Sequence, residues 1–317
     1  MSEVRLTFLG TGTSQGVPII GCQCPVCQST DPRDKRFRSA AFVQYEGFQI
    51  LIDAGPDFRM QMLRQGVRHL DALLLTHKHK DHTAGLDDVR SFNYIDRKAV
   101  EIYCENEVLQ ALRCDYAYAF ADHKYPGSPE WHVHLIDDRP FRITSLEHTG
   151  ELEWVHDKGY FYRKADGSLV PSDNAVVAAL PALPGADSGT LDGEKYLNII
   201  PIRGYHDQMP VLGFRFGGIA YITDMSSIPE SEFAKLEGLE HVSLNTVGYH
   251  PHHSHFSLDE ALDVAGRIGA KHTWLTHLSH AFPTYGAFCD DLRRRCAERG
   301  VRSDVQPAYD GLTVTAP

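Results

Sequence analysis

The run from residue 76 to residue 82 places three imidazoles and one carboxylate close together, as His77, His79, Asp81 and His82. A leucine-rich apolar stretch precedes it and is typical of a buried strand that ends in a loop. His77 and His79 can then face one metal ion, while Asp81 and His82 can face a second. Imidazole binds zinc, iron or manganese, and a carboxylate lets the site accept the harder ions of that series. A solvated His-rich loop is the alternative, but residue types and spacing favour metal ligands.

This motif after an apolar strand resembles the signature of the metallo-β-lactamase superfamily. The resemblance implies further ligands at later strand ends, where His206, Asp224 and His277 are found. Each of these residues alone is weak evidence for a metal ligand, because a polar residue after a strand is more often part of a turn. The resemblance implies two metal sites, one held by His77, His79 and His206, the other by Asp81, His82 and His277, with Asp224 bridging.

Two divalent ions against two carboxylates would leave a net positive centre, and a hydroxide bridging them would be a nucleophile at neutral pH. Such a centre suits an anionic phosphodiester better than a neutral amide. Asp81 is predicted to be a catalytic residue as well as a metal ligand. Manganese, zinc and iron all remain open as the active-site metal.

Three cysteines, Cys22, Cys24 and Cys27, lie within six positions, and His280 follows His277 by three residues. This set suits a tetrahedral structural zinc ion, with the histidine as fourth ligand. A disulfide and buried thiols are the alternatives. The disulfide is disfavoured because no secretory signal is visible at the start of the sequence.

The cysteine cluster, the glycine-rich opening at residues 8–18 and the His277–His280 pair narrow the resemblance to the phosphodiesterase branch. Within it, the chain resembles the cyclic phosphodiesterases of bacterial phosphonate breakdown, which open phosphoribosyl 1,2-cyclic phosphate. The strand-end ligands also resemble those of tRNase Z, but the cysteines with their partner histidine favour the former family.

The glycine-rich opening does not lead from a strand into a helix and carries no Walker lysine, so nucleotide binding of those types is rejected. Its glycines are instead interpreted as a tight backbone wall near the metals. Asp53, at another strand end, is expected to support the 76–82 loop from behind, although a plain turn role is almost as well supported.

Phosphodiester chemistry also needs a proton for the departing oxygen, and His255 is the best candidate for the general acid or a phosphate donor. A capping box begins at Ser257 and should hold the loop before a helix at residues 258–268. The resemblance agrees, since family members carry a histidine ahead of this helix. His250, His252 and His253 are better explained as a solvated loop.

The sequence has 317 residues, is 42% hydrophobic and has a formal net charge of −11. This charge opposes a broad nucleic-acid surface, and no apolar run reaches membrane-spanning length. A soluble cytoplasmic protein with a small-molecule phosphodiester substrate and no membrane or nucleic-acid partner is therefore expected. A homodimer is one open alternative for its oligomeric state.

Strands alternate with helical segments, including helices expected at residues 84–93 and 105–119, and predict an α/β fold. The resemblance implies an αββα sandwich, two mixed sheets packed face to face with helices outside. Residues 1–317 are expected to form a single hydrolase domain with an insertion at about 127–197. A hairpin turn is predicted near residues 165–168. The insertion could be a substrate lid, a dimer contact or a surface hairpin.

Three other functions are alternatives to the metal-dependent phosphodiesterase. A tRNA 3′-end nuclease would need a basic arm, whereas acidic side chains outnumber basic ones between residues 147 and 195. A thioester or lactone hydrolase would cleave esters and few phosphodiesters. A non-enzymatic metal-binding protein would leave the histidine beside the ligand set unexplained.

Overall fold

The computed structural model describes residues 3–145, 152–155, 158–163, 167–171 and 176–317. The chain forms two compact units. The terminal unit consists of Met1–Glu46 and Ile199–Pro317, and the central unit is Gly47–Asn198. Within the described part of the chain, no helix is long and apolar enough to cross a membrane.

The terminal unit contains strands from two sheets. In one, β1 (Val4–Gly10) pairs antiparallel with both β2 (Ala40–Tyr45) and β20 (Thr313–Ala316). The other is mixed, because its first three strands pair antiparallel with one another and its third to sixth strands pair parallel. In order these are β14 (Glu194–His206), β15 (Met209–Phe216), β16 (Ile219–Tyr221), β17 (His241–Asn245), β18 (His272–Thr276) and β19 (Asp304–Pro307). Phe8 of β1 and Tyr221 of β16 place their ring centroids 6.2 Å apart, so these strands face each other.

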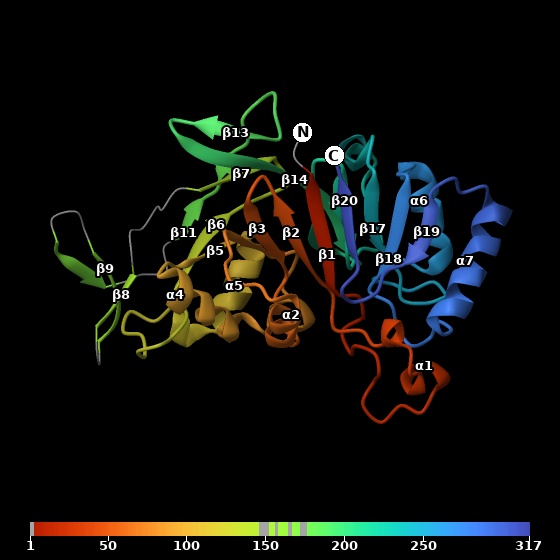
Figure 1. The fold of residues 1–317 in the computed structure, drawn as a ribbon, viewed down its shortest axis with the longest axis horizontal. Helices are drawn as coiled ribbons and strands as arrows, with labels where there is room; N and C mark the ends of the chain where they lie inside the picture. Colours follow the sequence, from red (N-terminus) through yellow and green to blue (C-terminus); the bar gives the residue numbers. More distant parts are fainter. Residues whose placement is uncertain (1–2, 146–151, 156–157, 164–166, 172–175) are drawn as a thin grey trace. The chain divides into compact units, whose positions relative to one another are not determined.

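The helical elements of the terminal unit are α1 (Pro25–Gln28), η1 (Pro32–Asp34), η4 (Glu230–Leu236), α6 (Leu258–Ile268) and α7 (Tyr285–Arg299). α6 and α7 lie beside β18 and β19 (Figure 1). α6 begins at the capping box of Ser257 and Glu260, and ends at Gly269, whose φ of 66° is left-handed. Its buried Leu258 and Leu262 belong to the same apolar cluster as residues of β17 and β18. The helix predicted at 258–268 therefore has the predicted bounds.

The central unit is built on five parallel strands, in the order β3, β4, β5, β6 and β11. Their bounds are β3 (Phe48–Ile52), β4 (Ala72–Leu74), β5 (Val100–Cys104), β6 (Trp131–Leu135) and β11 (Val176–Ala178). Parallel strands need crossover connections, which here carry α2 (Phe58–Gln65), α3 (Lys80–Thr83), η2 (Leu86–Val89), α4 (Arg90–Asp96), α5 (Asn106–Asp115) and η3 (Ala117–Ala119). The residues following β3 and β4 therefore leave the sheet at the same edge.

Two expected helices differ from the structure. The segment 84–93 is divided into the 3₁₀ turn η2 and the helix α4, and the segment 105–119 into α5 and η3. η2 follows Gly85 and has no side-chain cap, so nothing local fixes a regular α-helical start there. β6 was not expected as a strand.

The remaining strands lie in the segment 127–197. They are β7 (Phe141–Thr144), β8 (Leu152–Val155), β9 (Gly159–Arg163), β10 (Leu169–Pro171), β12 (Leu180–Pro181) and β13 (Ser188–Leu191). β8, β9 and β10 form a small antiparallel sheet. The hairpin turn predicted near 165–168 falls partly at residues 164–166, which lie outside the described residues, although β9 and β10 pair antiparallel on either side of it. Whether this segment is an insertion stays a prediction.

Candidate metal-binding and catalytic residues

In the central unit, the predicted ligands of the 76–82 run gather where β4 ends. The ring centroid of His77 lies 4.7 Å from that of His79 and 4.3 Å from that of His82. α3 begins immediately after His79 and carries Asp81, whose Oδ2 is 3.3 Å from Nε2 of His82. His77 and His82 are buried. The turn from strand into helix therefore brings all four side chains of the motif together.

Asp53, at the end of β3, supports this loop. Its carboxylate accepts hydrogen bonds from the backbone N–H of Thr76 at 2.9 Å, from the Thr76 hydroxyl, and lies 2.7 Å from Nδ1 of His82. Burial raises the pKa of Asp53, against the contacts with His82 and Thr76, which lower it. With Nδ1 of His82 held in this way, Nε2 is the nitrogen turned towards Asp81.

Two glycines that were not predicted to have a role also position the motif. A Cβ on Gly55 would lie 1.9 Å from the carbonyl oxygen of Asp81, and a Cβ on Gly85 would lie 2.1 Å from the carbonyl oxygen of Gly55. The same backbones are joined by a hydrogen bond of 2.8 Å from Ala54 N to the carbonyl of His82. The glycine at position 55, directly after β3, is the sequence signal from which this close backbone approach could have been predicted.

In the terminal unit, the three predicted strand-end ligands also lie together. His206 ends β14, Asp224 follows β16 and His277 follows β18. Nδ1 of His277 is 2.8 Å from Oδ1 of Asp224, and 3.1 Å from the hydroxyl of Ser39. His206, Asp224 and His255 each offer one ligand atom, and these atoms lie within 4.8 Å of one another. Such spacing of imidazole and carboxylate donors fits a divalent metal ion.

Three of the site residues have left-handed backbone conformations, which are uncommon outside glycine. The φ angles are 65° at Asp53, 58° at Asp224 and 55° at His277. Such residues cost on the order of 1–3 kcal/mol and persist where the surrounding structure holds them, often at functional sites. Asp53 and His277 follow β3 and β18 directly, and Asp224 lies three residues beyond the end of β16, so the left-handed backbone turns each side chain close to a strand end.

His255 lies beside the terminal-unit ligands. Its ring centroid is 4.5 Å from that of His206 and 4.9 Å from that of His277, with the second pair stacked. Its Nδ1 is buried and has no hydrogen-bond partner among the described residues. Burial, reinforced by His277, lowers the pKa of His255 to about 3. By contrast, His250, His252 and His253 are exposed, as expected for a solvated loop.

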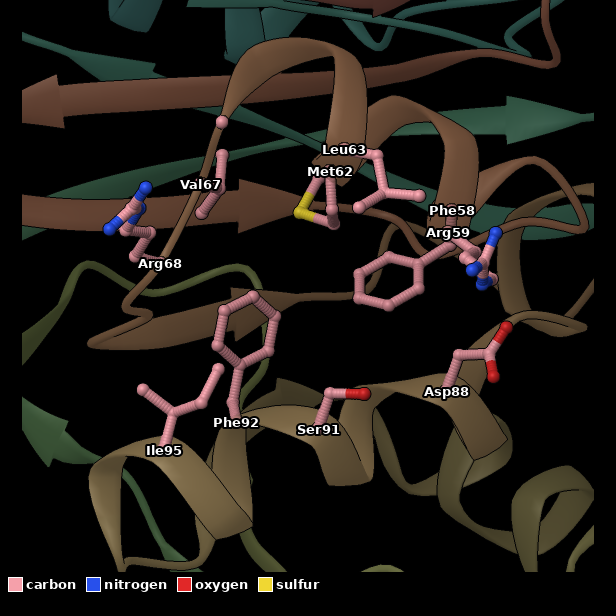
Figure 2. Close-up of a pocket in the computed structure, with 11 residues that line it drawn as sticks. Phe58, Arg59, Met62, Leu63, Val67, Arg68, Asp88, Ser91, Phe92 and Ile95 are labelled. Carbon is pink, nitrogen blue, oxygen red and sulfur yellow. The ribbon is translucent and has the colours of Figure 1, made fainter.

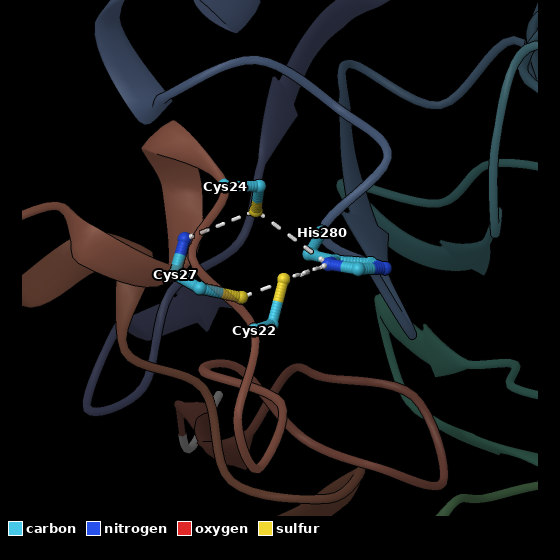
Figure 3. A group of neighbouring side chains, drawn as sticks. All are labelled: Cys22, Cys24, Cys27 and His280. Atoms are coloured by element: carbon cyan, nitrogen blue, oxygen red, sulfur yellow. Dashed lines mark hydrogen bonds between the residues drawn. The ribbon is translucent and has the colours of Figure 1, made fainter.

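The cysteine cluster also lies within the terminal unit, and Figure 3 shows its four side chains pointing towards one centre. Nδ1 of His280 is 3.3 Å from Sγ of Cys22 and 3.6 Å from Sγ of both Cys24 and Cys27. A tetrahedral zinc ion with ordinary Zn–S and Zn–N bonds spaces sulfur and nitrogen about 3.6 Å apart. The four residues therefore fit a closed zinc site.

The cysteine thiols have unequal acidities. The backbone N–H of Cys27 donates to Sγ of Cys24 and lowers the pKa of that thiol to about 6, while burial raises the pKa of the Cys27 thiol to about 11. The glycine-rich opening runs alongside the strand end of His277, because the backbones of Thr11 and Thr13 both bond to Leu278. The opening is thus close to two predicted ligands, His277 and His280.

A pocket of about 450 Å³ lies in the central unit between α2 and the η2–α4 segment. Figure 2 shows it lined by apolar side chains, among them Phe58, Met62 and Phe92. None of the predicted ligands or catalytic residues lines it. It is therefore not where the metal chemistry was expected.

Known proteins resemble this chain over most of its length. The family model described as Beta-lactamase superfamily domain matches residues 49–166 and 172–278. A solved structure described as a new diphosphatase from the PhnP family is 31% identical, with a TM-score of 0.72, over 100% of this chain and 98% of that one. Ribonuclease Z from Streptomyces avermitilis is 26% identical over 300 residues, 90% of this chain and 94% of that protein.

A protein named octanoyltransferase, from Porphyromonas gingivalis, is 32% identical over 312 residues. The match takes in 98% of this chain but 51% of that protein, so the chain spans about half the length of this relative. The family match crosses both sets of strand-end residues. The chain therefore belongs to the metallo-β-lactamase superfamily, has its αββα fold, and falls in the PhnP-like branch of that superfamily.

Proposed function

We propose that this protein is a metal-dependent phosphodiesterase that hydrolyses a small cyclic or linear phosphodiester. The observation that carries the proposal is the position of His255, a half-buried imidazole whose buried Nδ1 has no partner among the described residues, directly beside His206 and His277. A purely metal-binding protein would not need a further histidine beside the ligands that the family resemblance assigns. A hydrolase needs one, because the leaving oxygen must receive a hydrogen bond or a proton.

The donor sets of both units suit divalent metal ions. By resemblance to the family, the metal ligands would be His77, His79, Asp81 and His82 of the central unit and His206, Asp224 and His277 of the terminal unit. Bound metals would lower the pKa of a water molecule and stabilise negative charge on phosphoryl oxygens. Imidazole and carboxylate donors accept zinc, manganese or iron. Asp53 keeps His82 oriented for this task.

His255 would act on the phosphate side of the reaction. Its lowered pKa makes the ring neutral at pH 7 before substrate binds. A neutral imidazole still donates one N–H, and a nearby anionic phosphodiester would raise its pKa towards protonation. We therefore assign His255 first as hydrogen-bond donor to the phosphate, and then as the acid that protonates the leaving oxygen.

Phosphorus is preferred to carbon as the electrophile for two reasons. Two relatives that match this chain over nearly their own full length are named a diphosphatase and a ribonuclease. A centre with two cations and few carboxylates also attracts an anion better than a neutral ester. The net charge of −11 disfavours a long RNA as the substrate, so a small phosphodiester is proposed instead of a tRNA precursor.

We also propose that Cys22, Cys24, Cys27 and His280 bind a structural zinc ion. The sulfur–nitrogen distances support it, as does the closed set of four ligands, which leaves no position for substrate. Because His280 and His277 flank Leu278 and Ser279 on one short segment, this zinc would fix the segment that carries a catalytic ligand.

The test is hydrolysis of four substrates by metal-reconstituted protein: a ribose cyclic phosphate, a linear aryl phosphodiester, a lactone and a thioester. We expect diester turnover, and we expect His255→Ala to lower its kcat by about 10²–10⁴-fold, the range of general acid catalysis. His253→Ala is the matched control, since this exposed histidine lies in the same loop.

Metal content should be measured on each variant, so that a loss of ligands is not mistaken for a loss of acid catalysis. Equal diester turnover by wild type and His255→Ala would remove His255 from the mechanism. Lactone or thioester turnover without diester cleavage would overturn the substrate class.

A further inference from the structure

A second group of potential metal ligands lies in the central unit, on strands β5 and β6. Glu101, His132 and His134 each offer one ligand atom, and the three atoms lie within 4.8 Å of one another. The three residues are separate from the strand-end ligands and from the cysteine cluster. We propose that they bind one further divalent transition-metal ion of the zinc class.

The strand register explains why these side chains converge. β5 and β6 are parallel neighbours (Figure 1), and Glu101 is the direct partner of His132. Residues two apart on a strand project from the same face, so His134 joins His132 on the face that carries Glu101. Neighbouring strands are only about 4.8 Å apart, which lets ligands from both reach a single ion.

The distances between the ring nitrogens and the carboxylate oxygens fit the spacing of ligands around one metal ion. Nδ1 of His132 is 3.0 Å from Oε2 of Glu101 and 3.4 Å from Oε1, and Nε2 of His134 contacts the same Oε2. Nitrogen and oxygen ligands of a tetrahedral zinc ion lie about 3.3 Å apart. Two ring nitrogens aimed at one carboxylate oxygen would therefore need little movement to close around an ion.

The surroundings hold the histidines in place and shield most of their surface from bulk solvent. The ring of Tyr103 stacks on His134, at 4.4 Å between centroids and 11° between planes, and Phe141 of β7 stacks on Tyr103 in turn. The side chains of His132 and His134 are each 7% exposed, and that of Glu101 is 21% exposed. A rigid sheet with fixed rings is a pre-organised site, because the ligands lose little freedom on binding.

The donor set determines the class of ion. Two imidazoles with one carboxylate select zinc and its neighbours over magnesium or calcium, which prefer oxygen ligands. Three protein ligands leave one coordination position for water. The competing explanation is that both histidines simply donate hydrogen bonds to the Glu101 carboxylate without a metal ion. That arrangement requires a proton on Nδ1 of His132 and on Nε2 of His134, whereas metal binding requires both nitrogens to be unprotonated.

Zinc content decides between these explanations. Protein equilibrated with Zn²⁺ at a buffered free concentration, then freed of excess ion, should carry one zinc per chain less in His134→Asn and in Glu101→Gln than in wild type. The control is His123→Asn, an exposed histidine of the same unit, which should leave the zinc content unchanged. Equal zinc content in wild type and both cluster variants would overturn the proposal.

A second measurement does not depend on the folding of variants. Crystals of the wild-type protein grown with Zn²⁺ should give an anomalous difference peak within about 2.3 Å of ligand atoms of Glu101, His132 and His134. A peak at the cysteine cluster with none at Glu101 would rule the site out. Neither measurement uses turnover, so its result is independent of whether the protein is a phosphodiesterase.

Discussion

The two carboxylate oxygens of Asp53 have different partners. Oδ1 accepts from the backbone N–H of Thr76, Oδ2 lies against Nδ1 of His82, and the Thr76 hydroxyl is within hydrogen-bond distance of both oxygens. The residue thus fixes both the start of the 76–82 loop and the orientation of one ligand ring. This is the usual role of a carboxylate behind a metal-bound histidine.

Asp53→Asn should therefore weaken metal binding without removing a ligand. We expect metal affinity to fall by about 10–100-fold, because the amide no longer fixes which nitrogen of His82 carries the proton. The measurement is a competitive titration against a chromophoric chelator. Asp122→Asn, at an exposed position of the same unit, is the control. Unchanged affinity in Asp53→Asn would assign Asp53 to the turn alone.

At the scale of elements, Gly55 allows the end of β3 to pack against the α3 segment. An added methyl group would collide with the Asp81 carbonyl oxygen, which is backbone and cannot rotate away. We expect Gly55→Ala to lower the free energy of unfolding by at least about 1–3 kcal/mol, as overpacking does. The measurement is urea unfolding followed by circular dichroism.

The control for this substitution is Gly286→Ala in α7, where the added methyl group meets no atom within 4 Å. It should be neutral or stabilise by up to about 1 kcal/mol, because alanine favours a helix. If Gly55→Ala is as stable as wild type, the close approach of the two segments is not required for folding.

A histidine just before β4, His69, forms ion pairs with Asp71, which directly precedes β4, and with Asp96 at the end of α4. His69 lies 2.9 Å from Oδ1 of Asp71 and 3.0 Å from Oδ2 of Asp96. Hydrogen bonds to Asp71 and Asp96 raise the pKa of His69 from 6.5 to about 10. Since the native state holds the proton more tightly, this stabilisation is complete below pH 6.5 and is lost as the pH rises through 10.

His69→Gln should therefore be less stable than wild type at pH 6, with a gap that shrinks between pH 6.5 and 10. The side chain is 37% exposed, so solvent screening limits the gap to about 1 kcal/mol or less. Urea unfolding at pH 6, 8 and 10 measures it, with the exposed His123→Gln as control. A gap that widens with pH would contradict the assigned ion pairs.

Local signals explain which elements the sequence predicted correctly. The bounds of α6 follow from the Ser257 capping box and Gly269, both of which act within one helical turn. β6 was missed because its place depends on pairing with β5 and β11, which are distant in the chain. Single-chain periodicity does not report such pairing.

The same distinction, between local signals and contacts across the fold, applies to the site residues. His206, Asp224 and His277 were predicted from the family resemblance, which expects ligands after apolar strands, and these residues lie close together in the terminal unit. The role of Gly55 was not predicted, because the contact that requires it joins Gly55 to Asp81 across the fold. Glu101 likewise becomes a candidate ligand only once the register of β5 and β6 is known.

At the scale of the whole molecule, the cysteine cluster joins distant parts of the sequence. His280 meets Cys22 across 258 positions and Cys27 across 253. A metal ion that binds only the folded arrangement adds its binding free energy to folding, about 4 kcal/mol when free metal is a thousand times its dissociation constant. Zinc at this cluster should therefore support the entire terminal unit.

Removing this zinc is expected to lower the thermal midpoint by on the order of 10 °C, a shift that follows from such a stabilisation in a chain of this size. Cys24→Ser should show the drop and lose one zinc per chain, whereas Cys114→Ser, at an exposed position on α5, should show neither. Differential scanning calorimetry with zinc analysis measures both quantities. Because His280 lies three residues from His277, Cys24→Ser should also weaken metal binding at the strand-end ligands. A variant that loses its zinc yet keeps the wild-type midpoint would show that the cluster does not hold the fold together.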